Sequence, residues 1–147
     1  VSGDLCVGGE LPSDKGWKLV WSDEFKSRKV DSKKWNVLLR EQSKHGELQY
    51  YVPDEVYIEN DCLRLRSRVR DYGSMHYTSG RLDTSGKFAP TYGRFEIRAR
   101  LPSGKGLWPA HWLYPQNRDW AMERRRSLPF WISPVPGPWL YGLAHRR

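Results

Sequence analysis

Cysteine is scarce in this chain of 147 residues, which holds only Cys6 and Cys62. Two cysteines cannot build the dense disulfide framework of a small secreted domain. They form either one bridge, in an oxidising compartment, or two unrelated thiols, and the sequence does not decide between these. Histidine is also sparse, and its four copies are too scattered to suggest a metal site.

Long apolar runs are absent, because no stretch approaches the roughly 20 residues that span a membrane. There is no signal-peptide pattern, and the first residue is Val1, so we expect that a leader has been removed or that the chain is a fragment. Helical periodicity, a Gly-rich phosphate loop and a nucleophile elbow are missing as well. The pattern therefore gives no support to nucleotide-binding and serine-hydrolase classes.

Short alternating segments take the place of helices. Phe95, Ile97, Ala99 and Leu101 occupy one side of a predicted strand over 92–101, and charged residues occupy the other. Further strands are predicted for the segments 17–21, 47–52, 55–59, 62–69 and 106–114. Asn60-Asp61 is typical of a hairpin turn, and Pro109 predicts an edge or a bulge. Many short strands with close turn signals predict an all-β antiparallel sandwich in one domain.

Aromatic residues are abundant, with eight Trp and eight Tyr. Trp108 and Trp112 lie four residues apart and share one face of a predicted strand. Burial in a core is the commoner explanation for such a pair, since Trp is highly buried on average. A platform for stacking sugar rings is the alternative, and spacing alone favours the core.

The order of several motifs changes that weighting. The chain resembles glycoside hydrolase family 16, the laminarinase-like β-1,3-glucanases and β-glucan-recognition proteins, over about residues 17–120. The resemblance lies in WKLVWSDEF (17–25), KKW (33–35), ELQYY (47–51), SGRLDTSGKF (79–88), YGRFEIRARLP (92–102) and GLWPAHW (106–112). Ordered motifs of this kind are far more specific than any single match.

The resemblance implies a concanavalin-like β-jelly roll, an extracellular location and a β-glucan polysaccharide or oligosaccharide as the partner. We also expect a monomer with no cofactor, no metal and no membrane association. By resemblance, Trp108 and Trp112 line the sugar-binding cleft, and Arg81 is a weaker candidate for hydrogen bonding to sugar hydroxyls. Under the same extracellular assignment, we expect Cys6 and Cys62 to be bridged.

Catalytic carboxylates are where the chain departs from this family. Retaining hydrolysis needs two carboxyl groups about 5–5.5 Å apart, and the family supplies them as Glu-x-Asp followed by Glu, just beyond the GLWPA-type strand. Here that region contains Asp119 and Glu123, which do not match, so we assign no catalytic residue. Glu55, Glu59 and Asp61 are expected to form a solvated rim of exposed acids.

The last segment, 121–147, differs in composition from what precedes it. A basic run at 124–126 is followed by four prolines within ten residues, which favours extended or turn structure over ladder strands. We therefore divide the chain into an irregular lead-in (1–16), a jelly-roll domain incomplete at its C-terminus (17–120) and a divergent basic, Pro-rich tail (121–147).

Three functions remain open. The first is an endo-β-1,3-glucanase-like domain without catalytic carboxylates, inactive as given. The second is a non-catalytic β-glucan-binding module. The third uses the net charge of +8 to bind acidic glycan or nucleic acid, although much of that charge alternates with apolar residues, as on a solvated sheet face.

Overall fold

The computed structural model describes residues 18–41, 46–113 and 130–135, and the regular structure there consists of short strands with almost no helix. Its elements, in order, are β1 (Asn36–Val37), β2 (Arg40–Glu41), β3 (Gln49–Tyr51), the 3-10 turn η2 (Pro53–Glu55), β4 (Val56–Glu59), β5 (Cys62–Leu65), β6 (Ser67–Tyr72), β7 (Met75–Ser79), β8 (Leu82–Asp83), β9 (Trp108–Leu113) and β10 (Phe130–Val135). The all-β class predicted from the alternation is confirmed.

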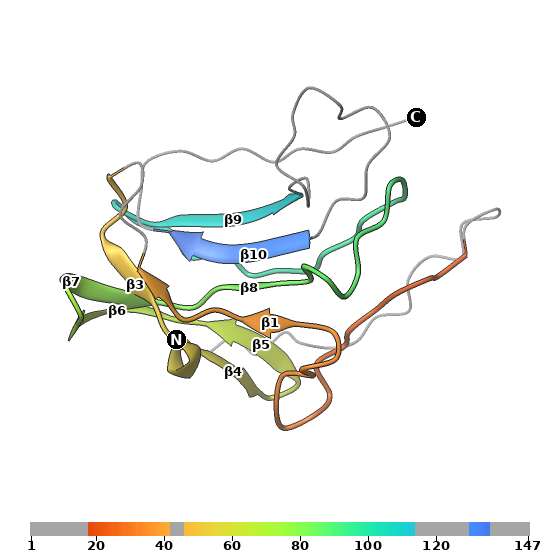
Figure 1. The fold of residues 1–147 in the computed structure, drawn as a ribbon, viewed down its shortest axis with the longest axis horizontal. Helices are drawn as coiled ribbons and strands as arrows, with labels where there is room; N and C mark the ends of the chain where they lie inside the picture. Colours follow the sequence, from red (N-terminus) through yellow and green to blue (C-terminus); the bar gives the residue numbers. More distant parts are fainter. Residues whose placement is uncertain (1–17, 42–45, 114–129, 136–147) are drawn as a thin grey trace.

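Three sheets are built from these strands. One has the order β1-β8-β10-β9, the second has the order β2-β3-β7-β6, and the third is the β4–β5 hairpin. Figure 1 shows β9 and β10 together at the top of the view, with β3, β6 and β7 grouped below them. All pairings are antiparallel except that of β3 with β7, which is parallel.

The β4–β5 hairpin follows directly from its turn residues. Asn60 and Asp61 both have positive φ, at 50° and 53°, and connect Glu59 to its partner Cys62. A two-residue hairpin turn of this hand needs positive φ at both positions, which Asn and Asp tolerate better than other residues with side chains. The predicted turn is confirmed.

Strand β9 confirms the expected strand at GLWPAHW, and its place in the sheet explains how Pro109 is tolerated. Among the described strands, β9 is the outermost of its sheet, where a missing N–H costs no ladder bond on the open side. Its partner is β10, which also pairs with β8. The expectation that the Pro-rich segment forms no ladder strand is therefore wrong for residues 130–135.

Two other predicted strands are absent. Residues 92–101 join no ladder within the described part of the chain, and Phe95, Ile97 and Leu101 are 39–46 % exposed. Leu19 and Val20, in the predicted strand 17–21, are also exposed and unladdered. Alternation records which side chains could share a face, whereas a strand exists only where a neighbouring backbone pairs with it.

A small aromatic core holds the β1–β8 end together. Trp35 and Leu82 are almost fully buried, and Trp21 and Phe25 pack on Trp35 at ring-centroid distances of 5.2 and 6.1 Å. The Trp35 indole N–H donates to Asp23 at 2.8 Å. The turn before it is capped by Asp31, whose carboxylate accepts the Lys33 N–H at 2.8 Å.

Candidate substrate-binding site

The chain crosses from one sheet to another between β7 and β8, at Gly80 and Arg81. The Gly80 N–H donates to the carbonyl of Arg66 at 3.2 Å. A Cβ at position 80 would lie 2.5 Å from the carbonyl oxygen of Glu55 and 2.9 Å from Val56. Only glycine allows the two backbones to approach this closely. The contact therefore fixes the backbone position immediately before Arg81.

Arg81 is held between two aromatic rings. Its guanidinium carbon lies 5.3 Å from the centroid of Tyr51 and 5.4 Å from that of Trp112. Both distances are within the range of a cation–π contact. Arg81 is only 6 % exposed, whereas Trp112 is 40 % exposed. The structure thus brings together two of the three predicted substrate-binding residues, with a solvent-facing tryptophan resting on a buried cation.

A polar network of Glu47, Gln49 and Tyr51 lies on β3 and just before it, and its Tyr51 contacts Arg81. The side-chain amide of Gln49 donates to Glu47 at 2.7 Å and to the Tyr51 hydroxyl at 2.9 Å. Burial raises the pKa of Tyr51, and the charge of Glu47 raises it further, so the phenol stays protonated at neutral pH. The Tyr51 hydroxyl in turn donates to Glu47 at 3.4 Å.

These three residues belong to ELQYY, which carried part of the family resemblance but was not predicted to form the site. They occupy alternate positions, 47, 49 and 51, so a strand places them on one face. Gln49 and Tyr51 are fully buried. Their alternate spacing could have predicted a shared strand face. Their position near Arg81 depends on the parallel β3–β7 pairing, which cannot be predicted from the local sequence.

Trp108, the third predicted residue, lies at the start of β9 and is half-buried. It shares its strand face with Trp112 and stands roughly 13 Å from it at ~3.3 Å per residue. That separation is enough for the two indoles to contact different sugar units. His111 points to the opposite face of β9, where burial lowers its pKa and keeps the ring neutral at neutral pH.

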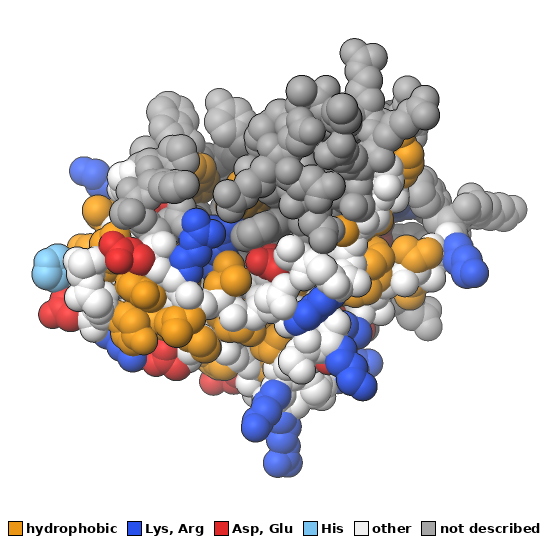
Figure 2. Space-filling model, viewed as in Figure 1, with side chains coloured by type: hydrophobic (Ala, Val, Ile, Leu, Met, Phe, Trp, Pro, Cys, Tyr) orange, Lys and Arg blue, Asp and Glu red, His pale blue; other side chains and the backbone are white. Residues whose placement is uncertain are grey.

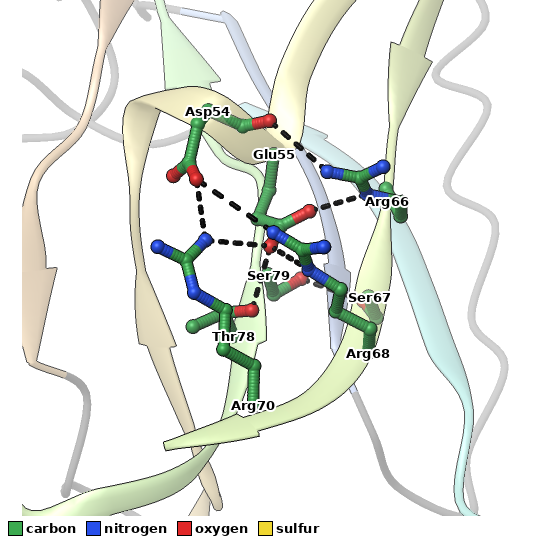
Figure 3. Close-up of polar contacts among 8 residues, drawn as sticks. All are labelled: Asp54, Glu55, Arg66, Ser67, Arg68, Arg70, Thr78 and Ser79. Carbon is green, nitrogen blue, oxygen red and sulfur yellow. Dashed lines mark hydrogen bonds and ion pairs between the residues drawn. The ribbon is translucent and has the colours of Figure 1, made fainter. Parts of the chain in front are cut away.

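A buried carboxylate lies behind the Gly80 contact. Glu55 is fully buried, so the expectation that it belongs to an exposed rim is wrong; Glu59 and Asp61 are exposed as expected. Figure 3 shows arginines from β5–β6 converging on it. Arg66 Nε and Arg68 Nε each lie 2.6 Å from a Glu55 oxygen.

The hydroxyl of Thr78 on β7 adds a third short bond to Glu55, at 2.7 Å. Arg70 also contacts Glu55, at 3.3 Å, and pairs with the neighbouring Asp54. Burial alone would raise the pKa of Glu55, but the hydrogen bonds from Arg66, Thr78 and Arg68 outweigh it and leave that pKa below its usual value. Part of the predicted solvated arginine face is therefore a clamp on a buried anion.

The other acids and the two cysteines lie away from this site or outside the described residues. Glu96 pairs with Arg94, two residues away on the same segment. Asp119, Glu123 and Cys6 lie outside the described residues. Cys62 is buried and carries no free thiol. Its pairing with Cys6 stays a prediction.

Within the described part of the chain, no group of three or more His, Cys, Asp or Glu side chains could hold a metal ion. The same part contains no helix long and apolar enough to cross a membrane.

In this all-β architecture ELQYY, SGRL and GLWPAHW meet around Arg81. Its structural similarity to solved laminarinases identifies the fold as the jelly roll of glycoside hydrolase family 16. A profile described as "Beta-glucan synthesis-associated protein SKN1/KRE6/Sbg1" matches residues 9–116. That match covers most of the chain, and the chain belongs to the family that this profile describes.

Known proteins agree with this assignment. A beta-glucanase from Rhodothermus marinus is 45 % identical over 123 residues, which are 77 % of this chain and 42 % of that protein. The X-ray structure of the laminarinase from Rhodothermus marinus superposes with a TM-score of 0.63 at 43 % identity, over 71 % of this chain and 43 % of that one. The chain thus spans less than half the length of these relatives.

A shorter match points to a protein named for binding. A beta-1,3-glucan-binding protein from Penaeus monodon is 55 % identical over 45 residues, covering 31 % of this chain and 12 % of that protein.

Proposed function

We propose that this chain binds β-glucan through the face of β9 that carries Trp108 and Trp112. The observation that carries the proposal is the seating of Trp112, whose exposed ring lies over the buried guanidinium of Arg81. A ring held in this way loses little freedom on binding, and pre-organised aromatic anchors commonly supply most of the affinity of a site. The C–H faces of neutral sugar rings match such a surface.

Arg81 contributes to binding through Trp112 more than through direct contact. With 6 % of its surface exposed, it can present little of its guanidinium to a sugar hydroxyl. Its charge and planarity instead fix the orientation of the Trp112 ring between ligand and core. The glucanases and the glucan-binding protein among the relatives support β-glucan as the ligand class. An extracellular location and a monomeric state belong to the same proposal.

Binding without hydrolysis is the second part of the proposal. The sequence beyond GLWPAHW contains Asp119 and Glu123 where the family motif has Glu-x-Asp followed by Glu. The four-residue spacing of Asp119 and Glu123 does not supply a carboxylate pair on one strand face at the separation that retaining hydrolysis needs. A non-catalytic β-glucan-binding module and an inactive part of a glucanase share this property.

The alternative of a basic binder has less support. Figure 2 shows Lys, Arg, Asp and Glu side chains interspersed among hydrophobic ones on the face in view, rather than a surface of one sign. Three of the arginines of the 64–70 run are engaged with Glu55. A nucleic-acid site needs a clustered basic surface whose charges are available to phosphates.

Calorimetric titration with laminarin tests the proposal. Trp112→Ala and Trp108→Ala should each weaken binding at least about tenfold, whereas Tyr57→Phe, a half-buried aromatic on β4, should leave it unchanged. Affinity should hardly respond to salt between 50 and 200 mM, because the ligand is neutral. Binding that survives both tryptophan substitutions, or that collapses with salt, contradicts the proposal.

A further inference from the structure

The buried Glu55 cluster is joined to the Trp112 site by one short backbone path. The carbonyl of Glu55 accepts the N–H of Arg66 at 2.9 Å, and the carbonyl of Arg66 accepts the N–H of Gly80 at 3.2 Å. Gly80 also rests directly on the Glu55 carbonyl oxygen. Arg81 follows Gly80 in the chain. A shift of the Glu55 backbone would therefore move Gly80, the residue that precedes Arg81 in the chain.

The side chain of Glu55 explains why this path is stiff. Its two oxygens receive short bonds from Arg66, Arg68 and Thr78, which come from the β5–β6 junction, β6 and β7. A fully buried carboxylate satisfied by several donors has one low-energy position, because any displacement breaks a charge-assisted bond without water to replace it. Figure 3 shows the donors reaching it from different directions, which fixes it in space rather than along one line.

We infer that Glu55 is a positioning residue for glucan binding: its ion-paired carboxylate holds the Gly80 turn so that Arg81 lies between Tyr51 and Trp112. The inference rests on the proposed function for its effect on binding, but its effect on Arg81 can be observed without any ligand. Two observations support it: the close Gly80 contact, and the distances of the Arg81 guanidinium from the two rings.

The first measurement follows Arg81 itself by NMR in the full chain. The Nε–H resonance of Arg81, identified by its loss in Arg81→Gln, is shifted by the currents of the two rings that enclose it. In Glu55→Gln this resonance should move toward the position of an exposed arginine. In the matched control Glu59→Gln, which removes an exposed carboxylate paired with Arg64 at 3.4 Å, it should stay in place. An unmoved resonance in folded Glu55→Gln overturns the inference.

The second measurement is a double-mutant cycle with laminarin as the ligand. Glu55→Gln should weaken binding about three- to tenfold in the wild-type background and not at all in the Arg81→Gln background. A residue that only stabilises the fold would change binding equally in both backgrounds, and that result would overturn the inference. If Arg81→Gln and Trp112→Ala leave laminarin binding intact, the proposed function fails instead, while the NMR result still decides the role of Glu55.

Thr78→Val provides a second route should Glu55→Gln fail to fold. It preserves the shape of a buried side chain and leaves the carboxylate in place, but it removes the 2.7 Å hydrogen bond to Glu55. The Arg81 resonance and the laminarin affinity should change in the same direction as in Glu55→Gln, by a smaller factor. A folded Thr78→Val protein with both properties unchanged contradicts the inference.

Discussion

The phenol ring of Tyr51 supports the guanidinium of Arg81, whose central carbon lies 5.3 Å from the ring centroid, and both side chains are withdrawn from solvent. The hydroxyl of the same tyrosine belongs to the polar network with Gln49 and Glu47. Tyr51 therefore has two separable roles, one through its ring and one through its oxygen.

Tyr51→Phe should separate these roles. The ring remains beneath Arg81, but the buried amide of Gln49 loses an acceptor, which should lower the free energy of unfolding by about 1–2 kcal/mol. Laminarin affinity should change little, because Trp112 and Arg81 keep their places. Urea unfolding and calorimetric titration measure the two effects. Tyr57→Phe is the control for stability, and an equal loss in both variants would mean that the Tyr51 network contributes nothing special.

Gly80→Ala tests the close approach that precedes Arg81. The added methyl would meet the Glu55 carbonyl at 2.5 Å, so the turn must shift, at a cost near the upper end of the roughly 1–3 kcal/mol of overpacking. Laminarin binding should weaken as well. Gly86→Ala is the matched control: φ is +70° there with open space around it, so it should cost stability through backbone strain and leave binding intact. Normal binding by folded Gly80→Ala would contradict the argument.

The lowered pKa of Glu55 predicts a dependence of stability on acid. Because the folded-state pKa lies below the unfolded one, the stabilisation is fully present above the ordinary glutamate value of about 4.3 and is lost as pH falls through the folded pKa. Unfolding free energies measured from pH 7 to pH 3 should therefore converge for the wild type and Glu55→Gln at the acid end. A constant difference between them over this range would mean that the Glu55 carboxylate titrates normally.

Local chemistry explains which parts of this fold the sequence predicts. The Asn60-Asp61 turn is decided by two residues next to each other in the chain, and it appears as expected. Strand β9 was also expected from its alternation and from the family motif that it carries. Each of these features needs little information from distant residues.

Distant pairing explains what the sequence did not predict. Residues 92–101 alternate well yet join no ladder, while 130–135 look unsuited to a strand yet pair with β8 and β9. The acid Glu55 looked solvated because its neighbours along the chain are polar, but its partners Arg68 and Thr78 come from other strands. Trp112 and Arg81 were predicted individually, whereas the stacking that joins them depends on tertiary packing.

The chain as given should not hydrolyse laminarin. Cleavage requires a proton donor and a nucleophile, or an activated water, on either side of one glycosidic oxygen. Asp119 and Glu123, the acids nearest the position of the family motif, would stand roughly 13 Å apart on a strand at ~3.3 Å per residue. That exceeds both the about 5–5.5 Å of a retaining pair and the about 6.5–9.5 Å of an inverting one. Tryptophan stacking can bind and orient a glucan, but it supplies neither proton nor nucleophile.

A reducing-sugar assay on purified protein checks this last expectation. Incubation with laminarin should release no more reducing ends than a heat-inactivated sample, while calorimetry on the same preparation shows binding that depends on Trp112. The two readouts together separate a folded protein without catalytic carboxylates from one that has simply lost its structure. Release of sugar that disappears in Glu123→Gln, but persists in the control Glu59→Gln, would show that Glu123 takes part in catalysis and that the departure from the family motif is only apparent.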